Sequence, residues 1–316
     1  MPHGVPPPYA QGTTRVPCPP SGECPLVRLE IQASVPDTAT STTFSTGRAH
    51  RIELESQANP TPPLLSGKST ILRLNFPALA HNDPGKVETQ AMLLPKLRKA
   101  LKQAADPAKA PGMQAYMKSA MPYHGVSAPA LRAVCKAAFA DVEFATAAEW
   151  QAEVLAIWRG ARFREERYTA IGLAGHKRFS AYQTPAAVKM YEEMIVTGAW
   201  WDYVDSIASH RIGQILRDYP APMRLKMLSW SKSPDIWKRR TSILCQLGFK
   251  AQTDLNLLFA CIEPSLESRE FFLRKAIGWA LRQHAWTDAA EVRKYVERNR
   301  SRLSALSIRE ALKNIG

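Results

Sequence analysis

From residue 88 to its end the chain reads as one helix after another, with short loops and almost no alternating strand pattern. Helix start signals recur along this stretch. Thr146 and Glu149 form a capping box, and Thr184 stands where an N-cap precedes a proline at the first helical position. Pro222 and Pro234 are placed similarly. These signals predict an all-α fold.

The predicted helices are short, and none carries a long heptad run. A HEAT-like α-solenoid, a curved stack of antiparallel helix pairs, fits this pattern better than a four-helix bundle or a coiled coil. Four pairs recur at about 35 to 40 residues, the spacing of HEAT-like units, near 147–174, 185–217, 222–247 and 252–284. Helices are expected near 89–105, 112–120, 128–140, 147–158, 163–174, 185–196, 200–217, 222–231, 235–247, 252–262, 268–284, 288–298 and 307–314.

The first 87 residues differ in composition from the rest of the chain. They hold fourteen of the 24 prolines, none of the eight tryptophans and three aromatic residues in all, Tyr9, Phe44 and Phe76. So few large apolar side chains cannot offset the entropy lost on ordering the chain. We therefore predict a disordered extension over 1–87 and one folded domain over 88–316.

The chain carries 42 Lys and Arg against 28 Asp and Glu, a formal net charge of +14. Nearly all of this excess belongs to 88–316, since the first 87 residues hold seven basic and six acidic side chains. A basic domain suits a polyanionic partner, and nucleic acid is favoured over a membrane because no Lys-rich amphipathic surface helix stands out.

The five cysteines are scattered, with neither a CxxC pair nor a Cys/His cluster at metal spacing. Cys245 and Cys261 fall within apolar helical patterns and are interpreted as buried thiols in a reducing compartment. There is no apolar run of about 20 residues, and the N-terminus lacks the features of a secretory signal. We expect a cytoplasmic protein that holds no metal.

An acid interrupts an apolar face in the stretch Trp200-Trp-Asp-Tyr-Val-Asp205. If 200–208 is helical, Asp205 shares one face with Trp201, Val204 and Ala208. Burying a carboxylate costs several kcal/mol unless it is paired. Asp205 therefore needs either a partner or a catalytic role.

Two later helices carry similar exceptions. Arg240 lies on the apolar face of 235–247, where it could pair with a neighbouring carboxylate or donate two bonds to a phosphate. Lys275, Trp279 and Arg282 form one stripe on 268–284, and aromatic and basic side chains on one face are typical of nucleic-acid binding, although a helical tryptophan is more often core. Together these exceptions favour a groove face over a core.

More basic residues fall at helix ends and in loops. Each alone is best explained as a solvated charge, but on one rim of successive helix pairs they could follow a phosphate backbone. They are Arg159, Arg162, Arg164, Arg167, Lys177, Arg178, Lys238 and Arg239.

The ordered set of Trp201, Asp205, Arg240 and Trp279 resembles the AlkD family of DNA alkylation-repair glycosylases, which are built from HEAT-like repeats. The resemblance spans about 112–316. It begins at Tyr116-Met-Lys118 and Tyr123-His-Gly-Val-Ser-Ala-Pro129 and continues through Trp200–Ser206, Trp237-Lys-Arg-Arg240 and Glu270–Arg282, in which Lys-Ala-Ile-Gly-Trp279 is the sharpest piece. The family lacks a counterpart of the first 87 residues.

The resemblance implies roles for these residues. Trp201 and Trp279 look like the aromatic pair that flanks the lesion nucleotide, Asp205 like the catalytic carboxylate and Arg240 like the arginine that contacts phosphate. Tyr116, Arg239, Lys275 and Arg282 are the further candidates for binding DNA.

N3- or N7-alkylation makes a purine cationic and a good leaving group, so a carboxylate that stabilises the oxocarbenium-like sugar and positions water could suffice. The resemblance thus implies a monofunctional, monomeric glycosylase for alkylated purines in duplex DNA, without cofactor or lyase activity. Two alternatives remain: a HEAT-like module that binds damaged or branched DNA without catalysis, and a repeat scaffold for protein partners. The stripe on 268–284 speaks against the scaffold.

Overall fold

The computed structural model describes residues 93–315, and within them every regular element is a helix. The extension predicted over 1–87 lies outside the described residues. The α-helices are α2 (Leu93–Gln103), α3 (Ala110–Met117), α4 (Ala128–Phe139), α5 (Ala147–Gly160), α6 (Arg164–Ala174), α7 (Val188–Gly198), α8 (Trp201–Ser206), α9 (Gly213–Asp218), α10 (Pro220–Ser231), α11 (Ile236–Leu244), α12 (Leu255–Ile262), α13 (Phe271–Ala285), α14 (Ala289–Arg298) and α15 (Ala305–Leu312). The all-α prediction is confirmed.

Side-chain caps explain several of the helix starts. Thr146 Oγ1 accepts the backbone N–H of Glu149 at 3.2 Å, as the capping box predicts. Thr184 is the N-cap residue and Pro185 opens the following helix, as predicted, but the Thr184 side chain makes no capping bond and the helix is a short 3₁₀ helix before α7. The start predicted at Pro222 is wrong by two residues, because α10 already begins at Pro220.

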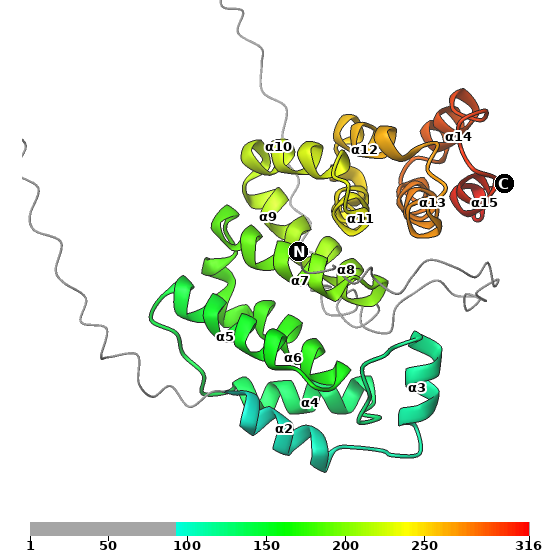
Figure 1. Ribbon diagram of the computed structural model, residues 1–316. Helices are drawn as coiled ribbons and strands as arrows, with labels where there is room; N and C mark the ends of the chain where they lie inside the picture. The colour runs from blue at the N-terminus through cyan, green and yellow to red at the C-terminus, as the bar shows by residue number, and fades with distance from the viewer. Residues whose placement is uncertain (1–92, 316) are drawn as a thin grey trace, which may run out of the picture. The chain divides into compact units, whose positions relative to one another are not determined.

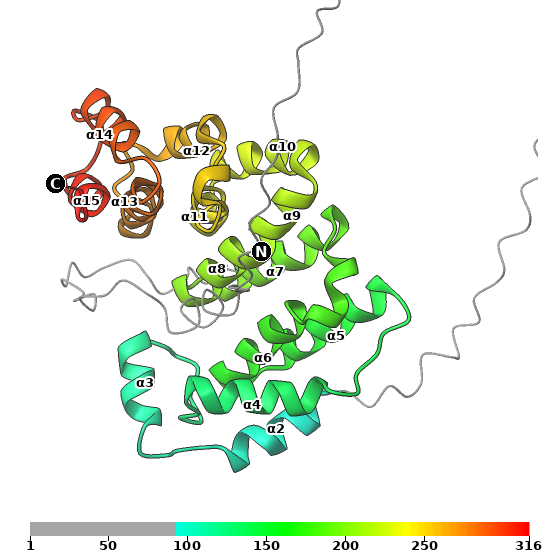
Figure 2. The same ribbon diagram turned by 180° about the vertical axis from the view of Figure 1, so that it is seen from behind.

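The helices pack mainly on near neighbours in the chain, as in a stack of repeats. α5 packs on α6, α7 on α8, and α10 on α11, as the predicted pairing requires. Figure 1 shows the colours following this order from α2 to α15. The fourth predicted pair is wrong in detail: α12 packs on α10 and α11, whereas α13 contacts α11, α14 and α15. Figure 2 shows the same neighbours from behind.

One helix was predicted over 200–217, and its middle departs from α-helical geometry. A π-helix, Ile207–Ile212, separates α8 from α9. The hydroxyl of Ser209 donates to the carbonyl of Asp205 at 2.6 Å where the two segments meet. π-helical turns are rare and occur often at functional sites. This turn directly follows the acid that the sequence singles out.

Gly278 explains a close helix contact in the C-terminal part of the domain. A Cβ added there would lie 2.5 Å from the Cβ of Glu310 and 2.9 Å from the carbonyl oxygen of Ser307. Only glycine therefore lets α13 and α15 approach so closely. The glycine of the Lys-Ala-Ile-Gly-Trp run thus has a packing role.

Candidate active site

Asp205 and Arg240 form a buried ion pair between α8 and α11. Their residues are 1% and 4% exposed. Arg240 Nε donates to Asp205 Oδ1 at 2.7 Å and Nη2 donates to Oδ2 at 2.8 Å, which is the bidentate geometry of a strong pair. The remaining nitrogen, Nη1, donates to the carbonyl of Phe272 on α13. The structure thus supplies the partner that the buried acid requires and joins three helices through it.

Burial raises the pKa of Asp205 above its ordinary value of 3.8. The charge and hydrogen bonds of Arg240 lower the pKa, and the negative charge of Asp202 raises it again. Both Asp205 oxygens accept N–H bonds from a guanidinium, a geometry that matches the ionised carboxylate. Arg240 is thus the group that favours the charged form in an environment that penalises it.

An aromatic cluster that sequence reasoning missed lies beside this pair. The ring of Phe272 lies 5.5 Å from that of Trp200 and 4.9 Å from that of Trp237, between centroids, and the Arg240 guanidinium lies 5.9 Å from the Phe272 centroid. The ion pair beside this cluster is buried, and burial strengthens its electrostatics. The tryptophans gave a signal in the sequence, because Trp237 lies three residues before Arg240 and Trp200 lies five residues before Asp205.

α8 carries a second buried acid that sequence reasoning also missed. Asp202 accepts two bonds from Arg164 Nη2, at 2.6 and 2.7 Å, and one from the hydroxyl of Tyr168 at 2.6 Å. Arg164 was predicted to stand on a basic rim, but its side chain is buried and its guanidinium lies 4.2 Å from the ring centroid of Tyr203. α8 is therefore held by an arginine on each side, from α6 and from α11.

Two of the predicted residues, Tyr116 and Trp201, line one cavity of about 220 Å³. Asp202 contributes to the same lining, whereas Asp205 does not. Tyr116 is 51% exposed. The remaining lining residues are apolar or aromatic: Met113, Met117, Tyr123, Val126, Ala128, Leu131 and Tyr168.

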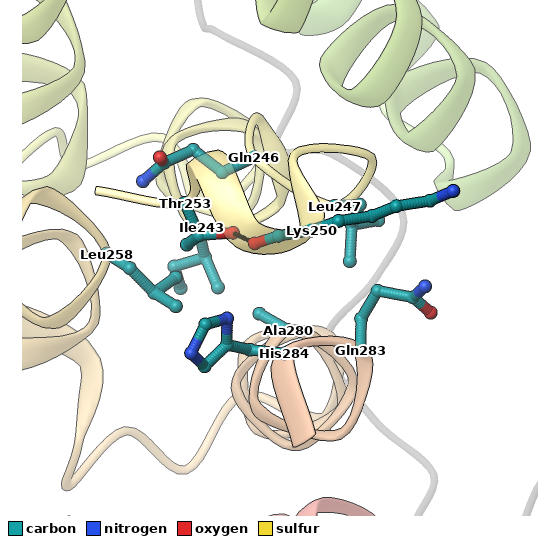
Figure 3. Close-up of a pocket in the computed structure, with 9 residues that line it drawn as sticks. All are labelled: Ile243, Gln246, Leu247, Lys250, Thr253, Leu258, Ala280, Gln283 and His284. Atoms are coloured by element: carbon teal, nitrogen blue, oxygen red, sulfur yellow. Dashed lines mark hydrogen bonds between the residues drawn. The ribbon is translucent and has the colours of Figure 1, made fainter. Parts of the chain in front are cut away.

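A second cavity, between α11 and α13, is unsuited to a nucleotide. Its volume is about 10 Å³, room for about one water molecule. Figure 3 shows His284, Gln283 and Ala280 on one side and Ile243 and the loop after α11 on the other. None of the predicted site residues lines it.

The stripe on α13 is paired with α15. Lys275 Nζ lies 3.0 Å from Glu310 Oε1, and Arg282 Nη1 lies 2.9 Å from Glu310 Oε2. The aromatic member, Trp279, is half-buried and packs against the C-terminal core. Both cations therefore pair with Glu310, an acid of α15 that the pattern of α13 alone did not reveal. DNA binding by Lys275 and Arg282 stays a prediction.

Other predicted basic residues also have protein partners. Arg239 donates to Ser265 Oγ and to the carbonyl of Pro264, after α12. Arg159 pairs with Glu193 at 2.6 Å and Lys238 with Glu192 at 2.5 Å. Arg178 donates to the carbonyls of Ala140 and Val142. Much of the predicted basic rim therefore bridges helices.

No group of three or more His, Cys, Asp or Glu side chains that could hold a metal ion occurs among residues 93–315. In the same part of the chain, no helix is long and apolar enough to cross a bilayer.

Residues 97–315 match the family model described as DNA alkylation repair enzyme, so the chain belongs to that family. Its role is accordingly in DNA repair, and the resemblance drawn from the sequence is confirmed. A solved structure described as a predicted DNA alkylation repair enzyme from Enterococcus faecalis is similar, with 28% identity, a TM-score of 0.60, and coverage of 67% of this chain and 97% of that chain. No curated protein matches.

Proposed function

We propose that this protein is a monofunctional DNA glycosylase that releases cationic N3- and N7-alkylated purines from duplex DNA. The observation that carries the proposal is the Asp205–Arg240 pair. Its buried carboxylate belongs to α8, the helix whose Trp201 lines a cavity, and it bonds to a guanidinium of α11. A fixed negative charge in a site of low polarity stabilises positive charge that develops nearby. The sugar of a departing alkylpurine is such a charge.

Asp205 acts on the sugar and not on the base. An N3- or N7-alkylated purine already carries a positive charge, so its glycosidic bond breaks without protonation of the leaving group. The carboxylate stabilises the oxocarbenium-like sugar and positions the water that attacks it, with one acid in place of the two that glycosidases use. Trp201 and Trp279 contribute through their faces, about 0.5 to 2 kcal/mol for each cation contact.

Arg240 links the carboxylate to the DNA backbone in this proposal. Its guanidinium has five N–H donors, of which one each on Nε, Nη1 and Nη2 is used within the protein. Two N–H groups therefore remain for a phosphate. Because Asp205 is only 1% exposed, DNA must draw Arg240 outward or widen the neighbouring cavity before the carboxylate reaches a sugar.

Tyr116, Lys275, Arg282 and Arg239 bind DNA around this centre in the same proposal. Tyr116 is the most accessible of these, at the edge of the cavity. The cavity lining contains no lysine, which supports hydrolysis without Schiff-base cleavage of the strand. The protein acts as a monomer in the cytoplasm, without metal or cofactor.

A non-catalytic module that binds damaged or branched DNA is the second candidate. Asp205 is 1% exposed and both of its oxygens bond to Arg240, which favours this candidate, because a carboxylate with a purely structural role needs no access to a ligand. The two functions differ in their product. A glycosylase leaves free base and an abasic strand, whereas a binding module leaves the lesion in place.

The test is base release from duplexes that contain one lesion. The purified protein should release N7-methylguanine and N3-methyladenine, and it should leave neutral O6-methylguanine in the duplex. The abasic strand should stay intact until alkali is added. Tight binding to these duplexes without release of any base would favour the binding module instead.

A further inference from the structure

We propose that Asp202 is a positioning residue, which ties α8 and Trp201 to the opposite wall of the cavity through Arg164 and Tyr168. The proposal rests on the proposed function for its kinetic consequences. Its structural consequence, the coupling of two chain segments, is independent of any activity. Asp202 lies three residues before Asp205, so the two acids are about one turn apart on the same short helix.

α8 needs such anchors because little in its own sequence stabilises it. It spans six residues, its N-cap residue Trp200 makes no side-chain capping bond, and a π-helix follows it directly. A helix of this length is unstable alone, so tertiary contacts must fix its position. The arginine pairs on Asp202 and Asp205 are the charged contacts that do so, from α6 and from α11.

The bonds of Asp202 continue across the cavity. Arg164 Nη1 donates to Ser119 Oγ at 3.3 Å, and the hydroxyls of Tyr168 and Tyr123 lie 2.9 Å apart. Since Tyr168 gives its proton to Asp202 at 2.6 Å, Tyr123 is the donor to Tyr168. A chain of hydrogen bonds thus runs from α8 to Ser119 and Tyr123, in the segment between α3 and α4.

The adjoining acid, Glu165, holds the same segment by its backbone. It accepts the N–H groups of His124, Gly125 and Val126 at 2.9 to 3.1 Å. Glu165 and Arg164 of α6 therefore both hydrogen-bond to the segment 119–126, and Arg164 also bonds to Asp202. Both segments line the cavity, α8 through Trp201 and Asp202 and the segment between α3 and α4 through Tyr123 and Val126.

The width of the cavity then depends on the Asp202 network. Without the carboxylate, Arg164 and Tyr168 lose their shared acceptor, and the buried guanidinium has no counter-charge. α8 would keep only the Asp205–Arg240 pair as its charged anchor, and Trp201 would lose its fixed distance from the opposite wall. A displacement of about 1 Å at a reacting centre can reduce the rate about a hundredfold.

The test compares Asp202→Asn with Asp218→Asn, a matched substitution at an exposed acid of α9 that bonds only to Gln214 in the described structure. Hydrogen exchange followed by mass spectrometry should show faster exchange in both 200–206 and 119–127 for Asp202→Asn, and no change in either for Asp218→Asn. Unchanged exchange in 119–127 would overturn the coupling, whether or not the protein releases bases.

Kinetics provide the second readout. Per folded molecule, Asp202→Asn should lower the single-turnover rate of N7-methylguanine release about tenfold to a hundredfold. The acid limb of the pH–rate profile should also move to lower pH in this variant, because the negative charge of Asp202, which raises the pKa of Asp205, is gone. Arg240 and Asp202 are the charged groups that act on Asp205 from α11 and α8. A rate and pH profile equal to wild type would overturn the positioning role.

If Asp202→Asn does not fold, Tyr168→Phe replaces it. This variant removes the hydroxyl between Tyr123 and Asp202 without changing any charge. It should speed exchange in 119–127 and lower the rate less than Asp202→Asn does, without moving the acid limb. Exchange in 119–127 that stays at the wild-type rate would contradict the proposal. If wild type releases no base, the proposed function fails, and the exchange data alone decide on Asp202.

Discussion

Replacing Arg240 with methionine should destabilise the domain strongly, because it leaves Asp205 buried without a partner. The carboxylate is 1% exposed and both of its oxygens depend on the guanidinium. Breaking a buried pair from one side costs about 3 to 5 kcal/mol. For a domain of this size, that loss lowers Tm by about 6 to 20 °C. Thermal and urea unfolding followed by circular dichroism measure it.

The loss of stability caused by Arg240→Met should be smaller at acidic pH. In the variant, burial still raises the pKa of Asp205, and the lowering by Arg240 is gone. An acid whose pKa is higher in the folded than in the unfolded state stabilises the fold most below its unfolded value, and this contribution is lost as pH rises through the folded value. Wild type and Arg240→Met should therefore differ less at pH 5 than at pH 7.

The control replaces both partners. In Asp205→Leu/Arg240→Met no buried charge is left unpaired, so most of the lost stability should return. An exposed ion pair contributes below about 1 kcal/mol to the free energy of unfolding. A loss that small for Arg240→Met would refute the assignment of Asp205 and Arg240 as a buried pair in which each charge needs the other. A double variant no more stable than Arg240→Met would refute it as well.

Three further outcomes follow from the packing. Gly278→Ala should cost about 1 to 3 kcal/mol in urea unfolding, because the new methyl meets Glu310, and a cost near zero would mean that α13 and α15 separate easily. Glu165→Gln should cost about 1 to 3 kcal/mol and speed proteolysis between α3 and α4, since three backbone N–H groups lose their charged acceptor, and unchanged proteolysis would contradict this. Tyr116→Ala should change Tm by no more than about 1 °C, because the side chain is 51% exposed. The same variant should bind lesion-containing duplex more weakly than wild type. A large fall in Tm would place Tyr116 in the core.

Helical periodicity and capping residues predict the fold class well here, because amphipathic helices in a stack repeat the same local signals. Asp205 was recognisable as a buried acid from its position on an apolar face. Its partner was not determined by the sequence alone, since Arg240 is 35 residues away on another helix. The sequence left a phosphate or a carboxylate as alternatives, and in the structure Arg240 bonds to the carboxylate.

The second pair escaped prediction for a related reason. The sequence pattern did not single out Asp202, whereas in the structure α8 packs against α6, α7 and α11. Likewise, the acid that binds Lys275 and Arg282 comes from α15, outside the α13 pattern. Pairing between helices depends on tertiary packing, which a single-helix pattern does not contain. Two acids three residues apart on a short helix were the available signal.

The most direct test of Asp205 as the catalytic carboxylate is single-turnover release of N7-methylguanine by Asp205→Asn, with circular dichroism to establish that the variant is folded. Asparagine keeps the shape of the side chain and removes its charge. We predict that the folded variant still binds the duplex but releases the base at least about a hundredfold more slowly than wild type. Release at the wild-type rate would contradict it.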